Sequence, residues 1–174
     1  NNITKNYTIN LEGSFNFLDT GLFLGLSYTM QDYEDRSPFA ELSSNYRTDM
    51  WMFSFNTNFK IPLSLSLDLG LTENRPKAGN DYEDVYSGSI QLSYEPSENM
   101  FPINLSISVD DTRGKKSGED IGNTQWRIGL ESSFDLPILG TLSGCLEKVF
   151  YSDKVELSED YEELGVALSF SKTF

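Results

Sequence analysis

The sequence predicts an all-β protein: an antiparallel, up-and-down transmembrane β-barrel of which about nine strands are visible in residues 1–174. Three observations predict this fold. Apolar and polar residues alternate with a period of two along nine segments, aromatic residues mark both ends of these segments, and the connections alternate between short and long. The chain is expected to form a single domain, one segment of barrel wall.

The alternation is plainest in residues 63–72, where every second residue is leucine and Ser64, Ser66 and Asp68 lie between. Successive side chains of a strand point to opposite faces, so such a segment has one apolar and one polar face. Residues 142–150 form the least regular segment. The expected strands are residues 7–17, 22–29, 51–60, 63–72, 86–94, 101–110, 126–134, 142–150 and 164–174.

Bulk composition taken alone points away from a membrane. The hydrophobic content is 38% and the mean hydropathy is −0.39. No run of apolar residues is long enough for a membrane-spanning helix. A membrane strand, however, needs only about 9–11 residues, of which every second one is apolar. A barrel can therefore have a polar average composition and still cross a bilayer.

Alternation by itself also fits a soluble antiparallel sandwich or a soluble barrel. The positions of the aromatic residues favour the membrane, because amphipathic rings gather at the two bilayer interfaces. The first expected band comprises Tyr7, Tyr28, Trp51, Tyr86, Trp126 and Phe150. The second comprises Phe17, Phe59, Tyr94, Phe101, Phe134 and Phe174.

The connections differ in length at the two ends of the expected strands. Those at the Phe17 end are short: residues 18–21, 61–62, 95–100 and 135–139. Those at the Tyr7 end are expected to be long and charged: residues 31–49, 73–84, 111–124 and 152–162. Short periplasmic turns with long external loops are typical of outer-membrane barrels.

The last expected strand places Val166, Leu168, Phe170 and the final residue Phe174 on one face. This segment resembles the C-terminal signature of bacterial outer-membrane β-barrel proteins, although Lys172 departs from the apolar pattern. The resemblance extends to no single family. It implies location in the bacterial outer membrane, contact with outer-membrane lipid and lipopolysaccharide, and recognition by the barrel assembly machinery.

The expected number of strands is odd, whereas bacterial single-chain barrels have an even number. Residues 1–6 are not expected to add a strand. Two explanations stay open: a miscount near residues 142–150, or a C-terminal part of a larger even-stranded barrel whose parent chain supplies upstream strands or a periplasmic domain. The inward positions are mostly Ser, Gly, Thr, Ala and Asn, which would under-pack an eight-stranded lumen and favour the larger barrel.

The charged residues at inward positions are mostly acidic. The expected lumen-lining set is Glu12, Lys60, Asp68, Glu95, Asp110, Arg127, Glu131 and Glu147. If the lumen conducts, an acidic excess favours cations over anions. The alternative is that these charges only solvate a water-filled wall.

No catalytic constellation is evident. The chain lacks histidine, the usual base of the enzymes known in small outer-membrane barrels. Glu131 and Glu147 are conceivable as an acid–base pair, but pairing with Arg127 or with water is the simpler explanation. Cys145, the single cysteine, is expected to face the lumen as an inert small residue. The chain is therefore predicted not to be an enzyme.

No cofactor or metal site is predicted. Acidic clusters such as Asp32, Glu34 and Asp35 lack the spacing of a calcium-binding loop and are interpreted as solvated loops. Arg113, Lys115 and Lys116 form a basic patch in the expected third loop, where they could contact a lipid phosphate.

The net charge of −14 argues against a nucleic-acid partner, whose phosphates it would repel. The function predicted first is a water-filled pore or an export conduit with an acidic lumen of small residues. One alternative is a closed structural or adhesive barrel that acts through its external loops. A second is a soluble β-barrel or sandwich that binds a ligand. Fold class alone does not decide among them.

Overall fold

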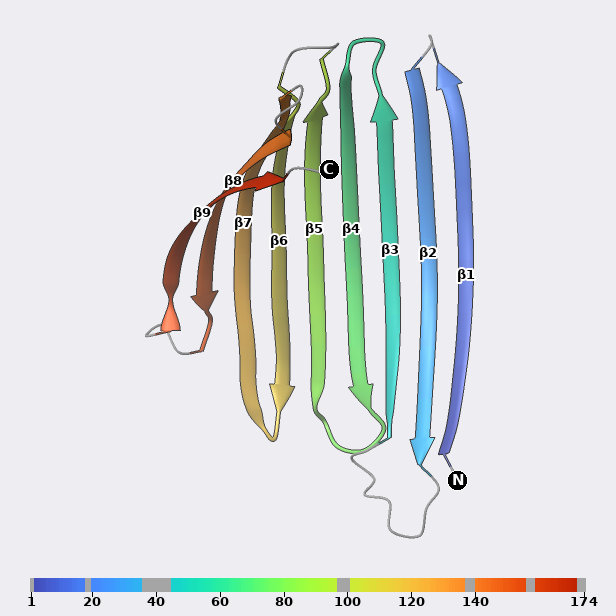
Figure 1. Cartoon of the computed structure of the whole chain (residues 1–174). Coiled ribbons are helices and arrows are strands. Elements are labelled where there is room, and N and C mark those ends of the chain that lie inside the picture. The colour runs from blue at the N-terminus through green and yellow to red at the C-terminus, as the bar shows by residue number, and fades with distance from the viewer. Residues whose placement is uncertain are drawn as a thin grey trace.

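The computed structural model describes residues 2–17, 20–35, 45–96, 101–136, 140–155 and 159–171. They form one nine-stranded antiparallel sheet in which each strand pairs with the next in sequence, as predicted. Figure 1 shows a single curved layer with β1 and β9 at its two edges. The strands are β1 (Asn2–Phe17), β2 (Thr20–Asp35), β3 (Tyr46–Asn58), β4 (Leu63–Pro76), β5 (Tyr82–Tyr94), β6 (Ile103–Lys116), β7 (Glu119–Leu136), β8 (Gly140–Asp153) and β9 (Tyr161–Ser171). No helix in these residues is long and apolar enough to cross a membrane.

The strand ladders run residue for residue, so the alternation of each strand stays in phase with that of its neighbours. Leu26 of β2, for example, pairs with Leu11 of β1 and Phe53 of β3, and Phe53 pairs with Leu69 of β4. Directly paired residues lie on the same side of a sheet. The sheet therefore has one continuous apolar face and one continuous polar face.

The apolar face has no cover. None of the hydrophobic side chains among the described residues is buried, and the accessible surface of the chain is 12402 Å². A compact globular protein of 19.7 kDa would expose about 8,600 Å². Ile107 in the middle of the sheet is 36% exposed, whereas Leu11 on β1 and Leu168 on β9 are 64% and 80% exposed because they have a neighbouring strand on one side only.

The eighth strand is present as β8, so the explanation by a miscount was wrong for the described part of the chain. Its irregular pattern has a local cause. Gly144 and Lys148 occupy apolar-face positions, opposite Leu168 and Leu164 of β9. The strand keeps its register although two of its apolar-face positions carry no large apolar side chain.

The strands at the Tyr7 end are longer than predicted. β1 begins at Asn2, five residues before its predicted start, so residues 2–6 lengthen the first strand and add no further one. The expected loop at residues 111–124 was wrong, because β6 and β7 continue through it and meet at Ser117 and Gly118. These two residues have φ angles of 55° and 87°, the positive values of a tight two-residue hairpin turn. Asymmetry between the two ends therefore arises here from strand extension rather than from a long loop.

Many of the aromatic residues on the apolar face lie in two bands, whereas Phe53 and Phe55 lie between the bands and Tyr82 lies beyond them. Tyr28 and Trp51 are direct partners with ring centroids 4.3 Å apart, and at the other end of the strands the Phe101 and Phe134 rings are 4.5 Å apart. Trp126 lies one row of paired residues further toward the short connections than Trp51. The band that contains Tyr28, Trp51 and Trp126 thus crosses the strands obliquely, as it does where tilted strands cross a flat interface.

Three predicted members of these bands need separate mention. Phe59 and Phe101 lie just beyond the ends of β3 and β6, in connections at the short-turn end. Phe174, which belongs both to the second band and to the predicted C-terminal signature, lies outside the described residues.

Candidate functional site

The candidate site is the polar face of the sheet. The ladder register places six of the predicted lumen residues on it, and Lys60 and Glu95 lie beyond the ends of β3 and β5 in short connections. Cys145 also lies on the polar face, where it pairs with Glu131 and Ala167. The six lumen residues placed by the ladders are Glu12, Asp68, Asp110, Arg127, Glu131 and Glu147.

Small residues make the layer of side chains on the polar face thin. A Cβ at Gly25 would lie 2.6 Å from Ser54 Oγ, and a Cβ at Gly129 would lie 2.6 Å from Ser106 Oγ. In both places a serine hydroxyl lies across the glycine of the neighbouring strand. The side chains of this face therefore form a shallow layer of hydroxyls instead of the bulky network that fills a closed small barrel.

Acidic groups outnumber basic ones on the polar face of the described strands. The basic residues there are Lys116 and Arg127. Arg127 lies 3.7 Å from Asp110 (Nη1 to Oδ2), and its Nη2 donates a hydrogen bond to Gln125 Oε1 at 2.9 Å. The acidic residues are Glu12, Asp35, Asp68, Glu83, Asp110, Glu119, Glu131, Glu147, Asp153 and Glu163.

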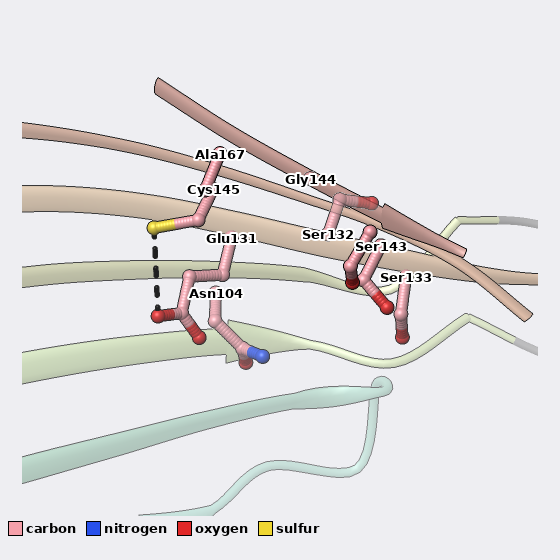
Figure 2. Close-up of a pocket in the computed structure, with 9 residues that line it drawn as sticks. Asn104, Glu131, Ser132, Ser133, Ser143, Gly144, Cys145 and Ala167 are labelled. Carbon is pink, nitrogen blue, oxygen red and sulfur yellow. Dashed lines mark hydrogen bonds between the residues drawn. The ribbon is translucent and has the colours of Figure 1, made fainter. Parts of the chain in front are cut away.

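A hollow of about 240 Å³ lies on β6 to β9 near the short-turn end (Figure 2). Figure 2 shows the Cys145 thiol, which donates to Glu131 Oε1 at 3.8 Å, and Asn104 of β6, the ladder partner of Glu131. Ser132 donates to the Pro102 carbonyl at 2.7 Å. The register partners of Cys145 include no imidazole and no cation that would activate a thiolate. The hollow is therefore a polar surface depression without a recognisable nucleophile.

The predicted pairing of lumen carboxylates was partly different. Arg127 contacts Asp110, whereas the sequence suggested Glu131 or Glu147 as its partner. Glu131 faces Cys145, and Glu147 lies in the neighbouring row opposite Gly129 and Gly165. The two glutamates thus occupy successive rows of the β7–β8 ladder.

Several hydrophobic residues on the polar face were missed in the sequence. Met52 lies there, 59% exposed, because it sits in phase with Ser54. Tyr151 stacks on Tyr161 with ring centroids 4.9 Å apart, at the end of the polar face nearest the hairpin turns. The further hydrophobic members are Phe23, Tyr33, Tyr46, Met50, Val85, Ile121 and Val149. Met52, Phe23 and Val149 lie at polar positions inside the predicted strands, and the others lie where the alternation continues past the apolar band.

The acidic residues that resembled loop clusters have protein partners. Asp32 pairs with Lys77, and Asp84 pairs with Arg75. Asp81 accepts a hydrogen bond from the Ser117 backbone N–H at 3.0 Å. Within the described ranges, no group of three or more His, Cys, Asp or Glu side chains is placed to hold a metal ion.

The geometry of the site is the basis for assigning a function. A comparison with protein-family models gives no match to the chain, and a comparison with curated proteins also gives none.

Proposed function

We propose that this chain forms part of the wall of a β-barrel in a bacterial outer membrane, and that its polar face lines a water-filled pore or export conduit. The observation that carries the proposal is the pair of continuous faces, one apolar and uncovered, the other polar and low in relief. Lipid would cover the first face, and water would fill the space on the second.

The height of the apolar band supports a membrane location. On β7 it runs from Trp126 to Phe134, which is about 27 Å along the strand at about 3.4 Å per residue. A strand tilt of about 40° reduces this to about 20 Å, close to the apolar band of about 25 Å in known barrels. A soluble sandwich would instead place a second sheet about 10 Å above this face.

The two sheet edges support a barrel larger than these nine strands. β1 and β9 run in the same direction because the strands alternate. Joining them directly would make a parallel pair, whereas an odd number of further strands between them would allow antiparallel pairing throughout. The open N–H and C=O groups of both edges must be paired inside a membrane. Leu11 and Leu168 would then gain the second neighbour that they lack.

The acidic excess on the polar face gives the proposed pore a preference for cations. Arg127 and Lys116 balance only a small part of the carboxylates there. Because the serines and glycines leave the carboxylates of Asp68 and Glu147 unobstructed by bulky neighbours in their rows, both are placed to face passing ions.

Planar-bilayer recording tests the proposal. The full-length protein is expected to produce stable current steps, with a reversal potential in a salt gradient that indicates cation preference. Correctly folded protein that gives no steps contradicts the pore and favours the closed, adhesive barrel. Protein that stays folded and monodisperse without detergent or lipid contradicts the membrane location itself.

The single cysteine provides a second readout. Cys145 lies on the polar face, so a water-soluble methanethiosulfonate reagent is expected to modify it in the membrane-embedded protein. A cationic reagent should react faster than an anionic one, because Glu131 and Glu147 flank the thiol in its own and the next row. The matched control moves the thiol to the other face, as Leu146→Cys with Cys145→Ala. Modification of that control at the same rate would contradict the assignment of the two faces.

A further inference from the structure

The cations of the nine described strands are unevenly divided between the two faces. The polar face carries Lys116 and Arg127, whereas the other strand cations lie on the apolar-face side. Of these, Lys148 lies within the apolar band. The rest lie at the Tyr7 end of the strands, beyond the aromatic band that contains Tyr28 and Trp51. Lys77 and Lys154 directly follow β4 and β8 and pair with Asp32 and Asp111 of the same face. Together these residues form what we term the cation belt: Lys5, Arg47, Arg75, Lys77, Arg113, Lys115 and Lys154.

The register brings the belt residues to neighbouring positions across the sheet. Arg47 pairs directly with Arg75, and Asp32 lies between Lys5 and Arg47. Further along, Arg113 lies directly opposite Asp84 in the β5–β6 ladder. Like charges placed directly opposite each other on paired strands are unfavourable unless anions lie close by.

Each of the three arginines forms an ion pair with a carboxylate one row of the same face nearer to the apolar band. The pairs are Arg47 with Asp49, Arg75 with Asp84 and Arg113 with Asp111. The arginine side chains are 50%, 38% and 65% exposed in that order, whereas the carboxylate side chains are 13%, 15% and 15% exposed. In each of these three pairs the guanidinium is therefore the more exposed group, although other carboxylates on this side, among them Glu73 at 37% and Glu162 at 65%, are exposed as well.

The carboxylates also orient the guanidinium groups. Arg47 binds Asp49 side-on, with Nε to Oδ2 at 2.7 Å and Nη2 to Oδ1 at 2.8 Å, which uses two of its five N–H donors. Arg113 binds Asp111 through Nε at 2.7 Å, and its guanidinium lies over the Tyr86 ring at 5.6 Å. A guanidinium already held in place loses less conformational freedom when it binds a further anion.

We propose that the cation belt binds the phosphate groups of lipid headgroups in the leaflet at the Tyr7 end of the strands. This inference rests on the proposed membrane location. The belt follows directly after the aromatic band, which marks the level where headgroups begin. Guanidinium forks match phosphate oxygens in charge and geometry. The aromatic rings of Tyr86 and Trp51 would then contact the upper part of the acyl chains below those phosphates.

Tryptophan quenching by brominated lipids tests the proposal, since the two tryptophans, Trp51 and Trp126, lie in the band next to the belt. The folded protein is placed in phosphatidylcholine vesicles that contain either brominated phosphatidic acid or brominated phosphatidylcholine. We expect phosphatidic acid to be preferred about fivefold or more, as for one retained contact between a basic residue and an anionic lipid.

The informative variant removes belt cations without changing the net charge: Arg47→Gln with Asp49→Asn, and Arg75→Gln with Asp84→Asn. It should lose most of the preference for phosphatidic acid. The matched control, Arg127→Gln on the polar face, should keep it. A second variant, Arg113→Lys, keeps the charge but loses the fork and should weaken the preference partly, which keeps the test decisive if the fourfold variant does not fold.

The outcomes separate the two proposals. Equal quenching by both lipids in the folded protein overturns the belt proposal and leaves the membrane location intact. Absence of quenching by either lipid contradicts the membrane location. Inorganic phosphate at millimolar concentration should leave the preference unchanged. If it abolishes the preference, the belt binds a soluble anion and the lipid proposal is overturned.

Discussion

Lys148 lies on the apolar face opposite Ile128 and Leu164, and its Nζ is 3.0 Å from Glu162 Oε2. The ammonium also lies 4.5 Å from the centroid of the Phe150 ring. Phe150 is one row nearer to the Tyr7 end of the sheet, so the lysine stem extends from the apolar band toward the interface. This is how a long cationic side chain remains on a lipid-facing surface.

The Lys148–Glu162 pair predicts an unusual order of stabilities. Glu162→Gln should lower the free energy of unfolding from lipid vesicles by about 1–2 kcal/mol, because the ammonium loses its partner near the apolar band. The double variant Lys148→Leu with Glu162→Leu should be at least as stable as the original protein. Reversible urea unfolding in vesicles measures both. A double variant less stable than Glu162→Gln would show that this part of the face does not contact lipid.

Gly114 is predicted to be the glycine least tolerant of alanine. It is buried where β5 meets β6, and a Cβ there would collide with the Tyr82 carbonyl oxygen and lie 3.1 Å from Glu83 Cα. Backbone atoms cannot rotate away, so Gly114→Ala should cost about 1–3 kcal/mol. Gly129→Ala is the matched comparison, because only the Ser106 hydroxyl must move. Equal losses in urea unfolding would contradict this explanation.

Tyr28 is predicted to stabilise, through its hydroxyl, the aromatic band that it forms with Trp51. The hydroxyl donates to Asp49 Oδ1 at 2.5 Å, and the same carboxylate binds Arg47. Tyr28→Phe should therefore cost about 1 kcal/mol. A double-mutant cycle with Asp49→Asn, followed by urea unfolding in vesicles, should give a coupling free energy clearly different from zero. Tyr86→Phe, which keeps the ring beneath Arg113, should have a smaller effect.

Neutralising polar-face carboxylates is predicted to reduce the cation preference of the proposed pore. Asp110→Asn with Glu147→Gln should shift the reversal potential in a salt gradient toward zero, because fewer fixed anions face the lumen. Asp111→Asn is the control from the adjacent residue, which points to the other face. If that control changes the reversal potential as much as the polar-face variant does, the charges of the polar face do not determine selectivity.

The faces of the sheet were predictable because alternation is a local property. Leucines at every second position from Leu63 to Leu71 define two faces whatever strand lies alongside. The same reasoning placed Glu131, Glu147 and Cys145 together on the polar side, and in the ladders these three residues share one face. The number of strands followed from the same count.

Strand extension and pairing required the tertiary structure. Residues 111–124 resemble a charged loop, yet they form two strand ends because the Ser117–Gly118 turn pairs them with each other. Arg127 binds Asp110 of the neighbouring strand, a contact that depends on register. The placement of Asp111 beneath Arg113 likewise follows from where the strands continue past the aromatic band.

The sequence by itself thus determined the all-β class, the nine strands and the chemistry of each face, since a period of two depends only on chain geometry. The tertiary structure decided how far the strands run, which charges meet, and that most strand cations lie on the apolar-face side beyond the aromatic band. Those features depend on the register between strands, which one chain segment cannot specify without its neighbour.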